Sequence, residues 1–452
     1  MQYTKRTSYV IMLVLISALI IDAITSNIYN LIGKEIDSIW GIIYFISISA
    51  VILIFGLVLL LGVIKEQSKL LRKTNLKFNK IYKLVVAVQF LIIAVFLFMV
   101  IQMVLTSQYF VIELTITSIV GSIPFYISLG LLAHRFFLWY SSSKQNIIVF
   151  LYGLAIVLIL IGNATLDTGV VSAFLNAPEI KKSLAMQLQG DSSINNSTNL
   201  MTMFSATFLR LAMVLLTISY IFLWIVSAIL LYGYSRRLGK STTYWMVIFL
   251  PPVFLLLGLF PSLLGFPNAD FSFFQLDADL FRILPTLATI AGGLLFAVSF
   301  FVLARSMRRI RQGTIADYLI IAGYGIALLP LPILANILFI PYPPIGSATC
   351  SALALASYVF SVGIYSSAIS ISEDAELRKS IRKTAVSELT LLDSIGTAQM
   401  SARLQGEVAT LVKEHSDKMV NTVGVEPNLT VEDAKEYLDE VIEELNKHRS
   451  SK

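Results

Sequence analysis

Three ionisable residues, Asp22, Glu113 and Arg210, lie inside or at the edge of long apolar runs. A charge in the hydrocarbon of a bilayer is costly, so such residues are rare and are candidates for a function by default. Counted along their runs, the three lie at similar depths, which would allow Asp22 and Arg210 to neutralise each other with Glu113 nearby. Two interpretations stay open: an ion pair that only fixes helix packing, or an outward-facing polar pocket that binds a ligand or couples an ion.

Other sequence patterns for chemistry are missing. The three histidines, His134, His415 and His448, stand far apart, and neither an HExxH motif nor a cysteine cluster offers a metal site. No P-loop and no GxGxxG motif after a strand offers a nucleotide cradle. The single cysteine, Cys350, excludes an intrachain disulfide. We therefore predict no catalytic residue, no metal and no cofactor, and whether the chain is an enzyme stays open, with the balance against it.

Composition sets the elements that must position these residues. Hydrophobic residues make up 56% of the 452 and charged residues 14%, whereas soluble proteins carry about a quarter charged residues. Continuous apolar runs of about 20 residues predict transmembrane helices. The sequence thus predicts an all-α polytopic membrane protein with about ten transmembrane helices. These are 8–30, 40–64, 84–106, 111–133, 147–164, 204–232, 244–265, 284–304, 318–340 and 345–371.

Charge predicts the orientation, because cytoplasmic loops carry an excess of Lys and Arg. With the N-terminus inside, the inner loops receive most of the cations, including all those of residues 65–83 and 305–311. The predicted outer loops hold only Lys34, Lys181, Lys182 and Arg282. Both termini are therefore expected in the cytoplasm. The net charge of +6 is a poor guide to partners, because the membrane part carries +11 and the tail from Glu373 onward carries −5. A basic face beneath a bilayer indicates topology and anionic headgroups, and it does not predict nucleic-acid binding.

The chain divides at the end of the last run, into a membrane part of residues 1–371 and a cytoplasmic helical tail of residues 372–452. Apolar residues recur at helical spacing from Leu377 to Ile395, and Thr430 begins a second amphipathic helix. We expect the first tail helix to continue the last span, or to follow it after one short break. Its apolar face must be covered by the tail itself, the inner loops, a second protomer or another protein.

Prolines interrupt two of the predicted spans. Pro251, Pro252 and Pro261 lie in or near the seventh, and Pro330 and Pro332 lie in the ninth. An interior proline kinks a helix, and interrupted helices can mark the binding site of a transporter. Residues 165–203 are expected to form a long outer loop that contains a short helix on the membrane surface.

A resemblance to a known group supports the architecture. `IIVFLYGLA`, `DYLIIAGYGIALL`, `LLDSIGTAQM` and the segment from Pro341 to Lys383 look like uncharacterised multi-span membrane proteins of ammonia-oxidising archaea. The resemblance implies an archaeal cell membrane and ten spans as a shared trait. It implies no catalytic or binding residues.

Two functions from different classes follow from these features. A tail with apolar helical faces favours a receptor-like or scaffold protein that relays or anchors through the tail, without a catalytic domain of its own. The alternative is a secondary transporter of a small solute or ion. The expected partners are membrane lipids and a protein or second protomer at the tail, and no nucleic acid.

Overall fold

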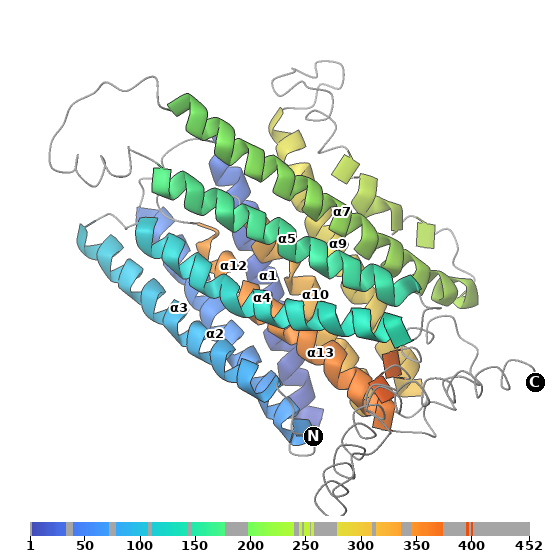
Figure 1. Cartoon of the computed structure of the whole chain (residues 1–452). Coiled ribbons are helices and arrows are strands. Elements are labelled where there is room, and N and C mark those ends of the chain that lie inside the picture. The colour runs from blue at the N-terminus through green and yellow to red at the C-terminus, as the bar shows by residue number, and fades with distance from the viewer. Residues whose placement is uncertain are drawn as a thin grey trace, which may run out of the picture. The chain divides into compact units, whose positions relative to one another are not determined.

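The structure is a computed structural model of the chain (Figure 1). It describes residues 2–32, 39–71, 78–106, 111–142, 147–176, 198–238, 244–245, 248–253, 255–256, 278–309, 313–335, 345–373, 395–396 and 399–400. Regular structure in these ranges is helical throughout. The principal helices are α1 Gln2–Ile32, α2 Ile39–Leu71, α3 Phe78–Thr106, α4 Val111–Ser142, α5 Ile147–Asn176, α7 Thr198–Leu238, α9 Ala278–Arg309, α10 Gly313–Leu328, α11 Pro330–Ala335, α12 Ser347–Ser351 and α13 Leu353–Glu373.

Eight stretches of the described chain are long and apolar enough to cross a membrane. They are Trp40–Lys65, Lys83–Leu105, Ile119–Ser141, Ile147–Gly169, Arg210–Tyr232, Leu287–Arg308, Gly313–Ile333 and Ser347–Ser372. The prediction of an all-α polytopic membrane protein is confirmed. The first predicted span lies in α1, a helix of 31 residues with a shorter apolar segment at Val10–Ser26. The predicted span 244–265 lies mostly outside the described residues.

One helix extends well past its predicted span. The apolar run ends near residue 164, but α5 continues to Asn176, because the sequence contains no proline before Pro178 and the helix tolerates Gly169. The first residues assigned to the outer loop are therefore helical. This difference brings Asp167 into the candidate span Ile147–Gly169.

The chain divides into two compact units. The first comprises Met1–Phe136 and Phe150–Ser367, and the second comprises Phe137–Val149 and Ala368–Lys452. The predicted boundary between the membrane part and the tail falls inside α13, which runs without interruption to Glu373. The expected continuation of this helix through residues 374–394 lies outside the described residues.

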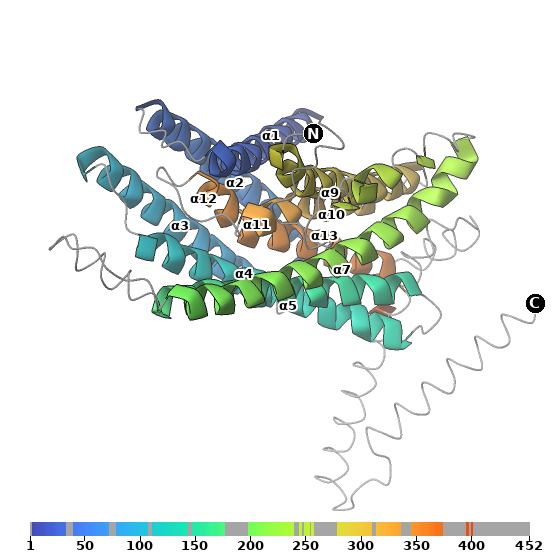
Figure 2. The ribbon, with the colours of Figure 1, turned by 90° about the horizontal axis from the view of Figure 1, so that it is seen from above.

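Helix α13 is the centre of the first unit. Every residue from Leu353 to Ser367 is buried. Its side chains reach several neighbouring helices: Leu355 approaches Gly56 of α2, Ser361 donates a hydrogen bond to the Ser128 carbonyl oxygen of α4, and the Phe360 ring meets Phe300 of α9. The views of Figures 1 and 2 show α13 among the helices of this bundle.

Glycines allow α13 to approach α10 at backbone distance. A Cβ atom on Gly325 would overlap the backbone of Phe360, and one on Gly363 would overlap the backbone of Ala322. Small residues at a membrane helix interface permit such close packing, which replaces the hydrophobic driving force that operates in water. The contact between α10 and α13 therefore depends on the lack of a side chain at Gly325 and at Gly363.

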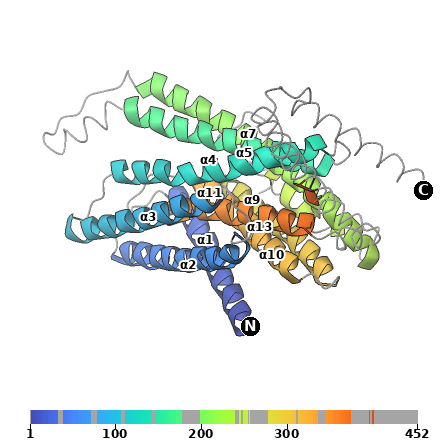
Figure 3. The same ribbon diagram turned by 60° about the horizontal axis from the view of Figure 1, so that its bottom comes forward.

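A second group of helices lies along one side of this centre. Helices α4, α5 and α7 lie side by side (Figure 3). Ser219 of α7 donates a hydrogen bond to the Ala155 carbonyl oxygen of α5, and Tyr220 donates one to the Ala288 carbonyl oxygen of α9. Both hydroxyl groups find a hydrogen-bond acceptor on a neighbouring helix, because the bilayer core holds no water that could accept the bond.

Candidate functional site

Asp22 of α1 is fully buried and is held by one short segment of the chain. Its Oδ1 atom accepts a hydrogen bond from the Gly346 backbone N–H at 3.2 Å. Its Oδ2 atom accepts bonds from the Thr349 backbone N–H at 3.2 Å and the Thr349 hydroxyl at 2.6 Å. The carboxylate thus caps the start of α12, where backbone N–H groups have no partner within the helix.

The turn before α12 is shaped to receive α1. Gly346 has φ of 94°, a left-handed conformation that residues with a side chain rarely adopt. Ser26, one helical turn after Asp22, donates a hydrogen bond to the Ile345 carbonyl oxygen at 3.2 Å. A Cβ atom on Gly346 would come within 2.7 Å of the Ser26 hydroxyl oxygen. One face of α1 therefore binds the turn through Asp22 and Ser26.

Two spans contain a one-residue turn. Leu329 separates α10 from α11, and Ala352 separates α12 from α13. Backbone hydrogen bonds continue through both turns, from the Leu329 N–H to the Gly325 carbonyl oxygen and from the Ala352 N–H to the Thr349 carbonyl oxygen. Helix α11 packs against both α12 and α1, the helix that carries Asp22.

A second polar cluster lies between α4 and α5. The Tyr126 hydroxyl donates a hydrogen bond to Asp167 Oδ2 at 2.7 Å and accepts one from Asn163 Nδ2 at 3.4 Å. Asn163 is fully buried, and its Oδ1 atom has no hydrogen-bond partner. We call Tyr126, Asn163 and Asp167 the α4–α5 cluster. A buried acceptor without a donor costs about 1–3 kcal/mol, so this oxygen is suited to a ligand.

The residues predicted as a site have different environments. Asp22 is buried in the membrane part, as its position in an apolar run indicates. Arg210 is exposed on α7, and the described partners of Asp22 are Gly346 and Thr349. Glu113 belongs to α4, but its side chain lies outside the described residues. The structure therefore does not bring Arg210 and Asp22 together among its described contacts, and a ligand-binding role for the three residues stays a prediction.

The α4–α5 cluster was missed from the sequence because Asp167 was assigned to the outer loop. The signal for it is nevertheless present. Asn163 and Asp167 are four residues apart, so they lie on one face of a helix if α5 continues beyond its apolar run. The absence of Gly or Pro between 163 and 168 allows that continuation.

The chemistry of the cluster is that of oxygen ligands. It combines a carboxylate, a phenolic hydroxyl and an amide oxygen, and such groups suit a proton or a hard cation better than a soft metal.

Comparison of the chain with models of known protein families, with curated proteins and with solved structures finds no match. The fold and these sites define the class: a polytopic helical membrane protein with ionisable groups buried among its spans.

Proposed function

We propose that the chain is a secondary transporter of a small solute or ion, coupled to cation binding at the α4–α5 cluster. One observation carries the proposal: the Asp167 carboxylate, bonded to Tyr126, lies beside a fully buried Asn163 oxygen without a donor. Ionisable groups inside membrane spans commonly mark ion pathways and proton relays. A proton or Na⁺ on Asp167 would neutralise the carboxylate, and Na⁺ would also use the free Asn163 oxygen.

The backbone beside Asp22 supports the same function. In transporters, irregular helices often lie at the substrate and ion site. Here α11 and α12, each joined to its neighbouring helix by a one-residue turn, pack together next to Asp22.

A carbodiimide experiment tests the cation site without knowledge of the solute. Dicyclohexylcarbodiimide reacts with protonated carboxyl groups in apolar surroundings, and mass spectrometry locates the modified residue. We expect modification of Asp167 in proteoliposomes, slower as the pH rises and slower with added Na⁺ if Na⁺ is the ion. The Asp167→Asn variant, which has no carboxyl group at this position, is the control. An Asp167 that never reacts, or one that reacts equally at every pH, contradicts the proposal.

Ion movement provides the second test. Proteoliposomes loaded with a pH-sensitive dye or with ²²Na⁺ are given a membrane potential, and flux is compared among wild type, Asp167→Asn and Tyr126→Phe. We expect Asp167→Asn to abolish coupled flux and Tyr126→Phe to reduce it. Equal flux in all three would remove Asp167 from the coupling step.

A receptor-like or scaffold role is the second candidate, and contacts in the second unit favour it. The Trp139 indole N–H donates a hydrogen bond to Gln399 Oε1 at 3.1 Å. Ile395 is 3% exposed, and a Cβ atom on Gly396 would overlap the Ile371 side chain. This part of the tail is packed against the ends of α4 and α13. A tail fixed in this way could report helix movement to a protein partner or to a second protomer.

Removing that anchor distinguishes the two functions. Trp139→Phe deletes the indole donor but keeps an aromatic ring, and Gln399→Ala deletes the acceptor. A relay through the tail predicts that both variants expose the tail to protease while ion flux is unchanged. A fall in flux in both variants would instead make the tail a part of the transport machinery.

Location in the cell membrane of an archaeon, which rests on the resemblance of the sequence, belongs to this proposal as well.

A further inference from the structure

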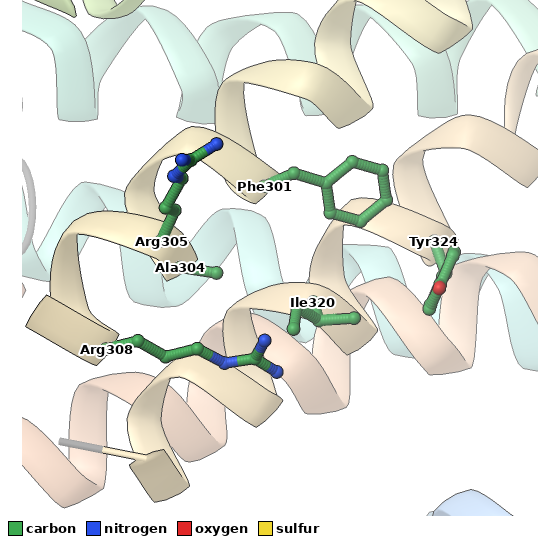
Figure 4. A pocket seen from close by; sticks show the side chains of 6 residues that line it. All are labelled: Phe301, Ala304, Arg305, Arg308, Ile320 and Tyr324. Carbon is green, nitrogen blue, oxygen red and sulfur yellow. The ribbon is translucent and has the colours of Figure 1, made fainter. Parts of the chain in front are cut away.

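A cavity of about 430 Å³ lies between α9 and α10 (Figure 4). Helix α9 contributes four residues to its lining, Phe301, Ala304, Arg305 and Arg308, and α10 contributes Ile320 and Tyr324. The volume lies within the roughly 300–1,000 Å³ of small-molecule sites. We call this cavity the α9–α10 groove.

The apolar side of the groove depends on one glycine, which leaves room for an aromatic ring. The Phe301 ring rests over Gly323, where a Cβ atom would come within 2.7 Å of the ring. The same ring meets Tyr324 edge to face, with centroids 5.3 Å apart. Ile320 and Tyr324 are four residues apart on α10, so they form one wall. This part of the groove is a surface for hydrocarbon.

The mouth of the groove is cationic. Arg308 donates a hydrogen bond to Asp317 at 3.2 Å, which offsets one positive charge. Arg305 is exposed and forms no ion pair with a described residue. Figure 4 shows the two guanidinium groups apart, with that of Arg308 directed toward Ile320 of α10. Among the described lining residues, Arg305 therefore keeps a positive charge at the end of an apolar groove.

The position along the spans matches the level of lipid headgroups. The candidate span of α9 ends at Arg308, and that of α10 begins at Gly313. The excess of cations in residues 305–311 predicts that this end faces the cytoplasm. Basic pockets between transmembrane helices on that side bind anionic headgroups.

We propose that the α9–α10 groove binds an anionic phospholipid of the inner leaflet. Its phosphate meets Arg305, and the upper part of one hydrocarbon chain lies along Phe301, Ile320 and Tyr324. The positive charge of Arg305 favours an anionic ligand. The apolar wall favours an amphiphile over a free anion. A zwitterionic lipid brings its own cation and gains less from Arg305.

The test measures lipid binding to the full chain by native mass spectrometry in mixed micelles, with phosphatidylglycerol and phosphatidylcholine as probes. We expect tighter binding of phosphatidylglycerol. Arg305→Gln should weaken that binding about fivefold, the value of one cation near a membrane surface, and should leave phosphatidylcholine unchanged. Ile320→Trp, which fills the groove, should weaken both lipids.

The matched control is Lys83→Gln, because Lys83 is also an exposed cation at the predicted inner end of a span. It should leave phosphatidylglycerol binding unchanged. An equal loss in Arg305→Gln and Lys83→Gln would show diffuse surface charge and overturn the proposal. Displacement of the lipid by inorganic phosphate would show a free-anion site and also overturn it. A dimer that disappears in Ile320→Trp without any change in lipid binding would assign the groove to a second copy of the chain.

Discussion

Helices α3 and α13 are both membrane spans, yet they have opposite surroundings. The candidate span in α3 has a mean hydropathy of 3.1 and is 33% buried, whereas the span of α12 and α13 has a mean hydropathy of 1.6 and is 94% buried. The more apolar helix is the more exposed one, the reverse of the rule for soluble proteins. Large apolar side chains meet lipid, while Ala, Ser and Gly meet other helices.

The two helices also differ in what their side chains do. Along α3, Leu97 and Phe98 are at least half exposed. Along α13, Ser361 bonds α4 and Gly363 permits backbone contact with α10. Lipid can fill the space left by a shortened side chain on α3, whereas nothing can refill a gap around α13. Four pairs of substitutions follow from this difference, from the largest expected effect to the smallest.

Phe360→Ala in α13 and Phe98→Ala in α3 delete the same atoms from the two environments. Phe360 is 1% exposed and packs on Phe300, so its loss leaves a cavity that should cost roughly 3–5 kcal/mol of the free energy of unfolding. Phe98 is 50% exposed, and its loss should cost about 0.5 kcal/mol or less. Titration with sodium dodecyl sulfate in mixed micelles measures both. Equal costs would mean that α13 is not the centre of the bundle.

Gly363→Leu should lower the free energy of unfolding by about 3 kcal/mol, because the new side chain overlaps the backbone of α10. Gly62→Ala is the control, since no atom lies within 4 Å of a Cβ atom there. That control should stabilise α2 by up to about 1 kcal/mol through helix propensity. Thermal unfolding in detergent gives both signs, and a stable Gly363→Leu variant would contradict the close contact of α10 and α13.

Asp22→Ala should cost about 2 kcal/mol, because it leaves the Gly346 and Thr349 N–H groups without an acceptor. Asp22→Asn keeps one acceptor oxygen and should cost about half as much. Unfolding by sodium dodecyl sulfate measures the ranking. The opposite ranking would show that Asp22 is more important as a charge than as a cap of α12.

Ser361→Ala removes one hydrogen bond to α4 and should cost about 0.6 kcal/mol, the average for such bonds between membrane helices. Ser47→Ala is the control on an exposed face, where the hydroxyl bonds the Ile43 carbonyl oxygen of its own helix. It should change stability by less than Ser361→Ala does. A reversed order would mean that hydroxyl groups of α13 contribute through packing alone.

Several features were predictable because they depend on local composition. The length and apolarity of each run predict a span, and the structure has a candidate span at eight of the predicted runs. The bounds differ most in α4, where the candidate span is Ile119–Ser141 and the predicted one was 111–133. The burial of Asp22 was expected from its position in an apolar run. Its partners were not, because Gly346 and Thr349 are more than 300 residues away and no motif links them to Asp22.

The end of α5 shows where an apolar run is a poor guide. Hydropathy falls after residue 164, but a helix ends where its backbone is interrupted, and α5 reaches Asn176. Asp167 was therefore assigned to a loop, although its spacing from Asn163 is helical. The pairing of Asp167 with Tyr126 depends on the packing of α4 against α5, which periodicity along one chain segment cannot specify.

The sequence by itself determined that the chain is a polytopic helical membrane protein, because bilayer thickness and the need to satisfy every backbone hydrogen bond leave long apolar runs no other structure. It also placed Asp22 in the membrane part. Only the tertiary structure decided that α13 lies at the centre, that Asp22 caps α12 and that Asp167 joins Tyr126. These arrangements depend on the close fit of side chains between helices, and many helix orders satisfy the same apolar runs.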